Sequence, residues 1–205
     1  MAVELVDLVA PGHTVLVTQE CQNGIIGDGA PMRELAEAAA PMKAAAGRLA
    51  AAAREAGITV IHCLAWHRAD GKAASSNARM LVVPRKLGMA LVPGSKDADV
   101  VPEIGVEEAD IVLGRYHGLG PMGGTELDMI CRNLGATTII GVGVSVNVGM
   151  LSLGLDAVNH GYQFVVPRDA VSGVPEDYAE AVLQNSFTMF GTVSDVDSII
   201  AAWTR

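Results

Sequence analysis

The stretch that decides the fold, TTIIGVGVSVNVGMLSLGLDA, runs from residue 137 to residue 157. Its first six residues, 137–142, form the β-branched and apolar run that is typical of a buried strand. The run breaks at Gly143, and an apolar segment of helical character follows, which we expect to end at 159–161. Open α/β sheets bind their ligands where a strand ends and a helix begins. The turn 143–149 is therefore predicted to lie at a functional site.

The same order of strand followed by helix recurs along the chain. Strands are expected at 14–18, 58–64, 110–114, 137–142 and 163–167, and helices at 33–56, 125–134, 176–190 and 195–203. Strands that are apolar on both faces are typical of a parallel sheet enclosed by helices. We predict an α/β fold, a Rossmann-like three-layer α/β/α sandwich with a mostly parallel central sheet, in a single domain over residues 1–205.

Composition narrows the class of protein and of partner. Hydrophobic residues make up 50% of the 205 residues, which suffices for one large core. The formal net charge of -9 argues against nucleic acid and anionic membranes as partners. The three cysteines show no paired spacing, and no apolar run reaches membrane-spanning length. We expect a cytoplasmic protein without disulfides whose partner is a small-molecule substrate.

Two further segments place polar groups at the ends of predicted strands. The first strand is followed by Gln19 and Glu20, and the third by Arg115, which opens a glycine-rich loop over 115–124. The carboxyl ends of parallel strands meet at one edge of a sheet, so these groups and the turn 143–149 are predicted to converge. The irregular segment 66–108 is expected to cross over this site or to form an oligomer contact.

These three segments resemble those of the isochorismatase-like hydrolases, a superfamily of cysteine hydrolases. That family shows a Gly-Val-x-Thr-x-x-Cys turn seven residues before an Asp-Ala pair, and here 143–149 precedes Asp156 and Ala157 in the same way. Residues 17–24 are similar to a family strand that ends in Asp-x-Gln-Asn. The resemblance implies that Glu20 stands at the catalytic aspartate, Arg115 at or near the lysine, and Gly149 at the cysteine.

All three members of the family's Asp-Lys-Cys triad are thus expected to be altered. Glycine has no nucleophile, although its backbone N–H can still contact an anion at the start of a helix. True isochorismatases also carry glycine there and cleave a vinyl ether by acid catalysis, but they keep the aspartate and the lysine. The resemblance implies a hydrolase that acts on a small, anionic substrate without a covalent cysteine intermediate. The alternative is a catalytically silent binding or scaffold protein on the same fold.

Individual residues are assigned roles from their chemistry. Glu20 is the candidate for acid or base catalysis, with a solvated strand-end carboxylate or an ion pair to Arg115 as the alternatives. Arg115 stays charged at any relevant pH, so it suits binding a carboxylate rather than proton transfer. His117 either shuttles a proton or is merely solvated. Substrate contacts are predicted for His117, Val144, Ser145 and Asn147, the last of which is equally suited to capping a helix.

No cofactor or metal is expected. His62, His67 and Asp70 differ in order and spacing from the Asp-x-His arrangement that binds metal in some relatives, and the loop 115–124 matches no phosphate-binding motif. A third hypothesis is an amidase that uses Cys21 as its nucleophile. However, Cys21 is next to Glu20 on an extended segment, so its side chain should point to the opposite face from that of Glu20. Members of the superfamily are commonly dimers or tetramers, so a homo-oligomer is expected.

Overall fold

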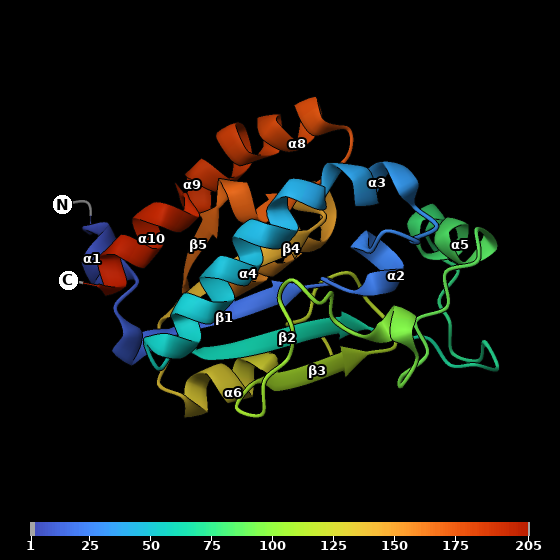
Figure 1. Ribbon diagram of the computed structural model, residues 1–205, viewed down its shortest axis with the longest axis horizontal. Helices are drawn as coiled ribbons and strands as arrows, with labels where there is room; N and C mark the ends of the chain where they lie inside the picture. Colours follow the sequence, from blue (N-terminus) through green and yellow to red (C-terminus); the bar gives the residue numbers. More distant parts are fainter. Residues whose placement is uncertain (1–2, 205) are drawn as a thin grey trace.

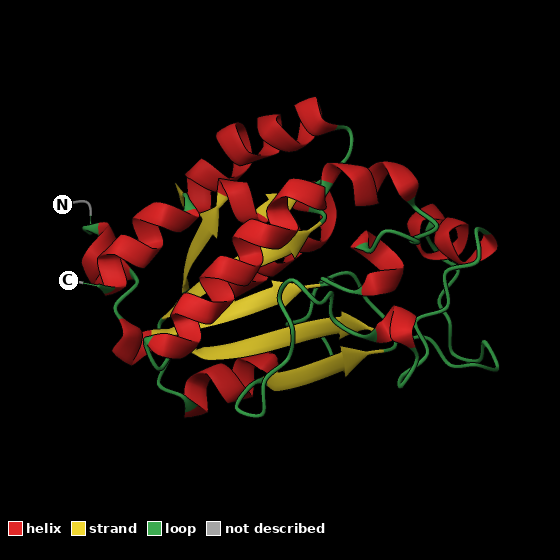
Figure 2. Ribbon diagram, in the orientation of Figure 1, coloured by secondary structure: helices red, strands yellow, loops and turns green. Residues whose placement is uncertain are grey.

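A computed structural model describes residues 3–204 and places a parallel sheet at the centre of the molecule (Figures 1 and 2). The strands lie in the order β3-β2-β1-β4-β5-β7, with the short β6 beside β4, and every pairing between them is parallel. Their bounds are β1 Thr14–Gln19, β2 Thr59–Ala65, β3 Ile111–Arg115, β4 Thr138–Val144, β5 Gln163–Pro167, β6 Val171–Ser172 and β7 Thr192–Ser194. The predicted fold class is confirmed.

Helices cover both faces of the sheet and complete three layers. One face is covered by α4 (Ala40–Glu55), α10 (Val196–Trp203) and α1 (Leu5–Leu8), the other by α6 (Leu127–Asn133), α7 (Leu151–Asn159) and α8 (Glu176–Val182). Neighbouring residues of a strand enter opposite cores, as Leu16 does on the α4 side and Val17 on the α6 side. The double burial explains why the strands are apolar throughout.

Shorter elements lie mainly around the carboxyl ends of the strands. They are α2 (Asn23–Ile26), α3 (Arg33–Ala38), α5 (Arg79–Lys86) and α9 (Thr188–Phe190), the 3₁₀ turns Pro11–His13, Lys96–Ala98 and Arg168–Ala170, and the π-helical turns Val146–Met150 and Leu183–Phe187. In Figure 1 the arrowheads of β1, β2 and β3 point toward α2 and α5. No helix within residues 3–204 has both the length and the apolar character needed to cross a membrane.

Three local features differ from the sequence prediction. The single helix expected over 33–56 is divided at Ala39 into α3 and α4, because Pro41 has no N–H to continue the hydrogen bonding of α3 and instead lies in the first turn of α4. The segment 66–108 contains α5, which was not predicted. The strands β6 and β7, of two and three residues, are too short to show a periodic pattern.

The order of the strands creates a crevice beside β1. The chain moves outward from β1 through β2 to β3 and then returns to β4 on the other side of β1. The connections from β1 and to β4 therefore leave on opposite faces, and ligands bind at such a reversal of strand order. Glu20 follows β1, and the turn 145–149 follows β4, so the crevice brings two of the predicted site segments together.

A buried polar network crosses the sheet away from this crevice. His62 is fully buried, with Nδ1 2.9 Å from Thr18 Oγ1 and Nε2 3.1 Å from Asp110 Oδ2. Arg54 donates to both oxygens of Asp110, at 3.2 and 2.7 Å. Burial, the largest cause, lowers the pKa of His62, with the Arg54 charge acting in the same direction and the Asp110 carboxylate opposing it. His62 is therefore neutral in the folded protein at pH 7.

This network predicts a loss of stability on mild acidification. Below about pH 6.5 the His62 of the unfolded chain takes up a proton that the folded protein does not bind, so the free energy of unfolding falls as pH falls. We expect chemical denaturation between pH 7.5 and 5 to show this slope, and His62→Gln to reduce it. His13→Gln, a change at a histidine outside this network, should leave the slope of the free energy of unfolding as it is. An unchanged slope in His62→Gln would contradict the assignment.

Candidate active site

Glu20 and Arg115 form an ion pair at the carboxyl edge of the sheet, as their strand positions predict. Arg115 Nη2 donates to Glu20 Oε1, with the arginine side chain 2% and the glutamate side chain 21% exposed. Glu20 has a φ of 54°, in the left-handed region that residues other than glycine seldom adopt. Such strained residues are common at functional sites.

The carbonyl of Leu119 joins the pair to a residue that the sequence did not single out. It accepts hydrogen bonds from Arg115 Nη2 at 3.2 Å and from Gln19 Nε2 at 3.3 Å. Within residues 3–204, Arg115 Nε and Nη1 and Gln19 Oε1 are buried without a hydrogen-bond partner. Leaving a buried polar atom unpaired costs about 1–3 kcal/mol. The fold therefore holds these polar atoms at an energetic cost.

Gly149 lies against Gln19, within the π-helical turn that follows β4. A Cβ at residue 149 would be 3.0 Å from Gln19 Nε2 and 3.0 Å from Val144 O, both closer than ordinary contacts. The Gln19 carboxamide thus occupies part of the space that a side chain at residue 149 would need. The sequence places Gln19 at this strand end but does not predict the contact with Gly149, because the type of residue does not reveal what its side chain packs against.

This packing predicts that residues 19 and 149 are energetically coupled. Gly149→Cys should destabilise the protein by about 1–3 kcal/mol, because the new side chain overpacks the turn. The loss should be smaller when Gln19→Ala is already present, since only the crowding against Val144 O remains. Urea denaturation of the two single variants and the double variant measures the coupling. If the changes in the free energy of unfolding of the two single variants add up to the change in the double variant, Gln19 does not fill this space.

The other predicted contact residues divide into two groups. Val144, Ser145, Gly149 and His117 line one cavity with Glu20 and Arg115, and the His117 ring packs so closely on Gly124 that a Cβ there would be 2.6 Å from Cε1. Asn147 is not among the lining residues, and its Nδ2 donates to Val174 O at 3.3 Å. The catalytic and binding roles of all these residues stay predictions.

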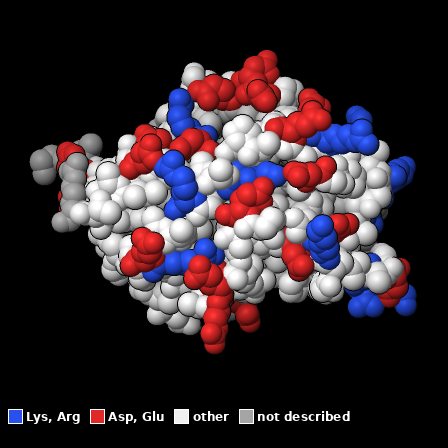
Figure 3. All heavy atoms as spheres, in the orientation of Figure 1, with Lys and Arg blue, Asp and Glu red and all other residues white. Residues whose placement is uncertain are grey.

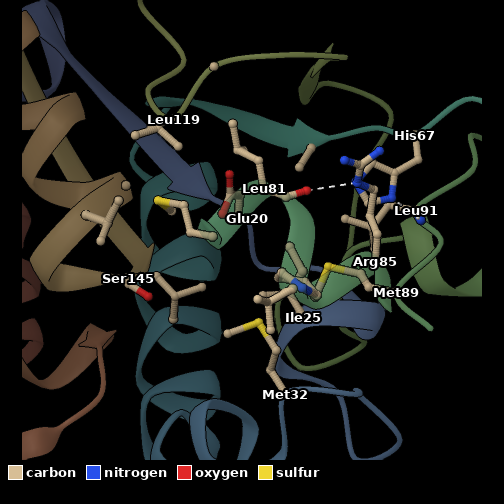
Figure 4. Close-up of a pocket in the computed structure, with 18 of the residues that line it drawn as sticks. Glu20, Ile25, Met32, His67, Leu81, Arg85, Met89, Leu91, Leu119 and Ser145 are labelled. Atoms are coloured by element: carbon tan, nitrogen blue, oxygen red, sulfur yellow. Dashed lines mark hydrogen bonds between the residues drawn. The ribbon is translucent and has the colours of Figure 1, made fainter. Parts of the chain in front are cut away.

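The cavity has a volume of about 410 Å³ and extends from Glu20 to α5. Figure 4 shows Glu20 and Ser145 on one side of it, with His67, Arg85 and Met89 on the other. Eleven residues between Trp66 and Leu91 contribute to the lining, so the segment 66–108 does cover the site. The alternative expectation for this segment, an oligomer contact, is not tested by a single chain.

The lining carries more positive than negative charge. Arg79, Arg85 and Arg115 contribute to it, whereas Glu20 is its only acidic residue among those described. Burial, followed by the nearby Arg85 charge, lowers the pKa of His67, so this histidine adds no charge at neutral pH. On the molecular face in Figure 3, acidic and basic side chains are intermixed. A cationic cavity in a chain of net charge -9 is therefore a local feature.

The three thiols lie in the cores. Cys21, Cys63 and Cys131 are at most 1% exposed, and burial raises the pKa of each to about 12. Cys21 packs in the core on the α4 side, as expected from its position next to Glu20, and does not line the cavity. Within residues 3–204, no group of three or more His, Cys, Asp or Glu side chains is placed to hold a metal ion.

Comparisons with known proteins identify the family. Residues 14–198 match the Isochorismatase domain. Ureidoacrylate amidohydrolase RutB of Serratia proteamaculans is 34% identical over 207 residues, which cover 92% of this chain and 82% of the relative. The corresponding enzyme of Methylobacterium radiotolerans is 32% identical, with coverages of 94% and 80%. The chain belongs to the isochorismatase family.

Solved structures agree with this assignment. A cysteine hydrolase from Pseudomonas syringae pv. phaseolicola superposes with a TM-score of 0.85 at 20% identity, covering 96% of this chain and 95% of that one. An isochorismatase family protein from Burkholderia thailandensis gives a TM-score of 0.75 at 28% identity, with coverages of 95% and 97%. The first likeness shows the fold, and the family resemblance seen in the sequence is confirmed.

Proposed function

We propose that this protein is a hydrolase that attacks a small, anionic substrate with water rather than with a cysteine thiol. The observation that carries the proposal is the Glu20 carboxylate beside Gly149 in a cavity that no thiol reaches. Relatives at 32–34% identity are ureidoacrylate amidohydrolases, which favours a substrate with an amide or ureido C–N bond. The cationic lining supports the anionic character of the substrate.

Glu20 is suited to act as the base in this reaction. Its Oε1 is held by Arg115, and within the described chain Oε2 has no hydrogen-bond partner. The ion pair requires the carboxylate, which is the form that accepts a proton. Glu20 Oε2 takes a proton from water while the water oxygen forms a bond to the substrate carbonyl carbon. As the C–N bond then breaks, the same proton passes to the leaving nitrogen.

The other groups position the substrate and stabilise developing charge. Arg115 holds Glu20 and the Leu119 carbonyl through Nη2, and its positive charge at the cavity attracts an anionic substrate group. Ser145 presents its hydroxyl on the cavity side (Figure 4). Backbone N–H groups near Gly149 complete the site for the carbonyl oxygen as it becomes negative. His117 also lines the cavity and is assigned a contact with the substrate.

The first prediction from this mechanism concerns Glu20. Glu20→Gln removes the base while keeping the size of the side chain, so we expect kcat/KM to fall by about 10²- to 10⁴-fold. Turnover is measured on ureidoacrylate, isochorismate and a panel of small amides. Glu55→Gln makes the same change at an exposed residue of α4 and should leave the rate unchanged. Equal rates for the wild type and Glu20→Gln would rule out the proposed role.

The second prediction concerns the thiols. Since Cys21 is buried and its pKa is raised to about 12, it does not supply a nucleophile at neutral pH. Cys21→Ala should retain the hydrolytic rate within about threefold, and treatment of the folded wild type with iodoacetamide should not inactivate it. Loss of the rate in a folded Cys21→Ala protein would instead support the reading in which Cys21 is the nucleophile.

A catalytically silent binding protein is the second candidate function. The specific observation in its favour is that Glu20 and Arg115 bind each other, which leaves neither free as an isolated catalytic group. A ligand that binds only the folded state raises the melting temperature whether or not it is converted. A thermal-shift screen followed by product analysis separates the two functions. A stabilising ligand that is never converted favours binding, whereas detectable product excludes it.

A further inference from the structure

Much of the cavity wall beyond the ion pair is apolar. Ile25, Met32, Leu81 and Met89 line this part, and they surround it in Figure 4. Met32 lies just before α3, Leu81 belongs to α5 and Met89 follows α5, so the wall is assembled from separate segments. A cavity with polar groups at one end and apolar walls at the other is complementary to an amphipathic molecule.

Two polar side chains in this part, those of Arg85 and His67, are already engaged, whereas Arg79 of α5 adds a positive charge to the lining. Arg85 donates from Nε to Leu81 O at 2.8 Å and from Nη2 to Ser75 O at 2.7 Å, which ties α5 to the loop before it. His67 accepts from Leu91 N at 3.2 Å through Nδ1. The pKa of His67 is lowered by burial, and the ring is neutral at pH 7. These two residues therefore brace the wall and leave its apolar surface to meet a ligand.

Helix α5 forms a wall with no core of its own. None of its eight residues is buried, and two of its cavity-lining side chains, Met80 and Val83, are 43% and 42% exposed. A helix in a globular protein normally buries its apolar stripe against a core. Here those side chains face the cavity instead, so an apolar ligand would remove them from water.

The volume sets the size of that ligand. A dry apolar cavity of about 150 Å³ takes up benzene, and this cavity measures about 410 Å³. It is therefore large for a substrate such as acetamide, and it has room for a ring or chain in addition to the reacting group. Met32, Met80 and Met89 add flexible thioether side chains, which adapt to ligands of different shape.

We propose that the preferred substrate carries an apolar body, either an aromatic ring or a hydrocarbon chain of roughly six to nine carbon atoms. The proposal rests on the hydrolytic function proposed above and specifies its substrate class. The scissile amide lies at Glu20 and Arg115, and the apolar body lies between Met32, Met89 and α5. Met80 and Val83 are specificity residues, because they contact only the part of the substrate that does not react.

A matched pair of amides tests the substrate class. The wild-type enzyme should hydrolyse 2-benzylsuccinamate with a kcat/KM about 30- to 100-fold higher than succinamate, as expected for burial of a phenyl-sized apolar group. Both amides carry the carboxylate that the proposed function requires. Met80→Gln and Val83→Asn should each reduce this selectivity about tenfold. The same changes at exposed residues outside the cavity, Met129→Gln and Val106→Asn, should leave the selectivity unchanged. Equal kcat/KM for the two amides would overturn the proposal.

A binding measurement separates this proposal from the hydrolytic function. Calorimetry with 3-phenylpropanoate and acetate, neither of which can be hydrolysed, should show that 3-phenylpropanoate binds at least tenfold more tightly. If it does so while neither amide is cleaved, the apolar substrate class stands and the hydrolytic proposal fails. If succinamate is cleaved and the two acids bind equally, the hydrolytic proposal stands and the apolar substrate class fails. No binding of either acid also overturns the substrate class.

Discussion

The close approach of β1 and β4 at Gly143 is the constraint on which the site depends. Gly143 is paired with Gln19, and a Cβ at residue 143 would be 2.2 Å from Gln19 O. Its φ of 117° is also one that side-chain-bearing residues rarely adopt. Only glycine meets both demands, so β4 can end level with β1. The turn after β4 then reaches Gln19 and Glu20 at the point where the order of strands reverses.

The ion pair shows how the fold supports a charged group at this edge. A buried guanidinium is costly unless it is paired, and Glu20 supplies the opposite charge within the same crevice. The pairing is incomplete, because Arg115 Nε and Nη1 and Gln19 Oε1 have no partner in the described chain. The sheet and its two cores therefore stabilise an arrangement that is unfavourable by itself, as is common where a site is built to receive a ligand.

The sequence predicts the sheet well because the strands are buried on both faces and are bounded by glycine or polar residues. It also predicts that Glu20 and Arg115 meet, since parallel strands end at one edge. It does not predict the contact of Gln19 with Gly149, a residue 130 positions away. Helix α5 was missed because it lies in a segment rich in small and charged residues, and its apolar side chains face a cavity rather than a core. Oligomeric state and the roles of the site residues are properties of the assembly and the reaction, and they stay predictions.

The carbonyl of Leu119 has a consequence for how the site is assembled. This one oxygen accepts from side chains on two different strands, Gln19 of β1 and Arg115 of β3. It belongs to a loop with glycines at 118, 120, 123 and 124, two of which have positive φ. Displacement of the loop would take the acceptor away from both side chains at once. The position of a surface loop and the alignment of the ion pair are thus linked through a single backbone atom. A movement of the loop that opens the cavity would therefore also change the geometry of Glu20 and Arg115.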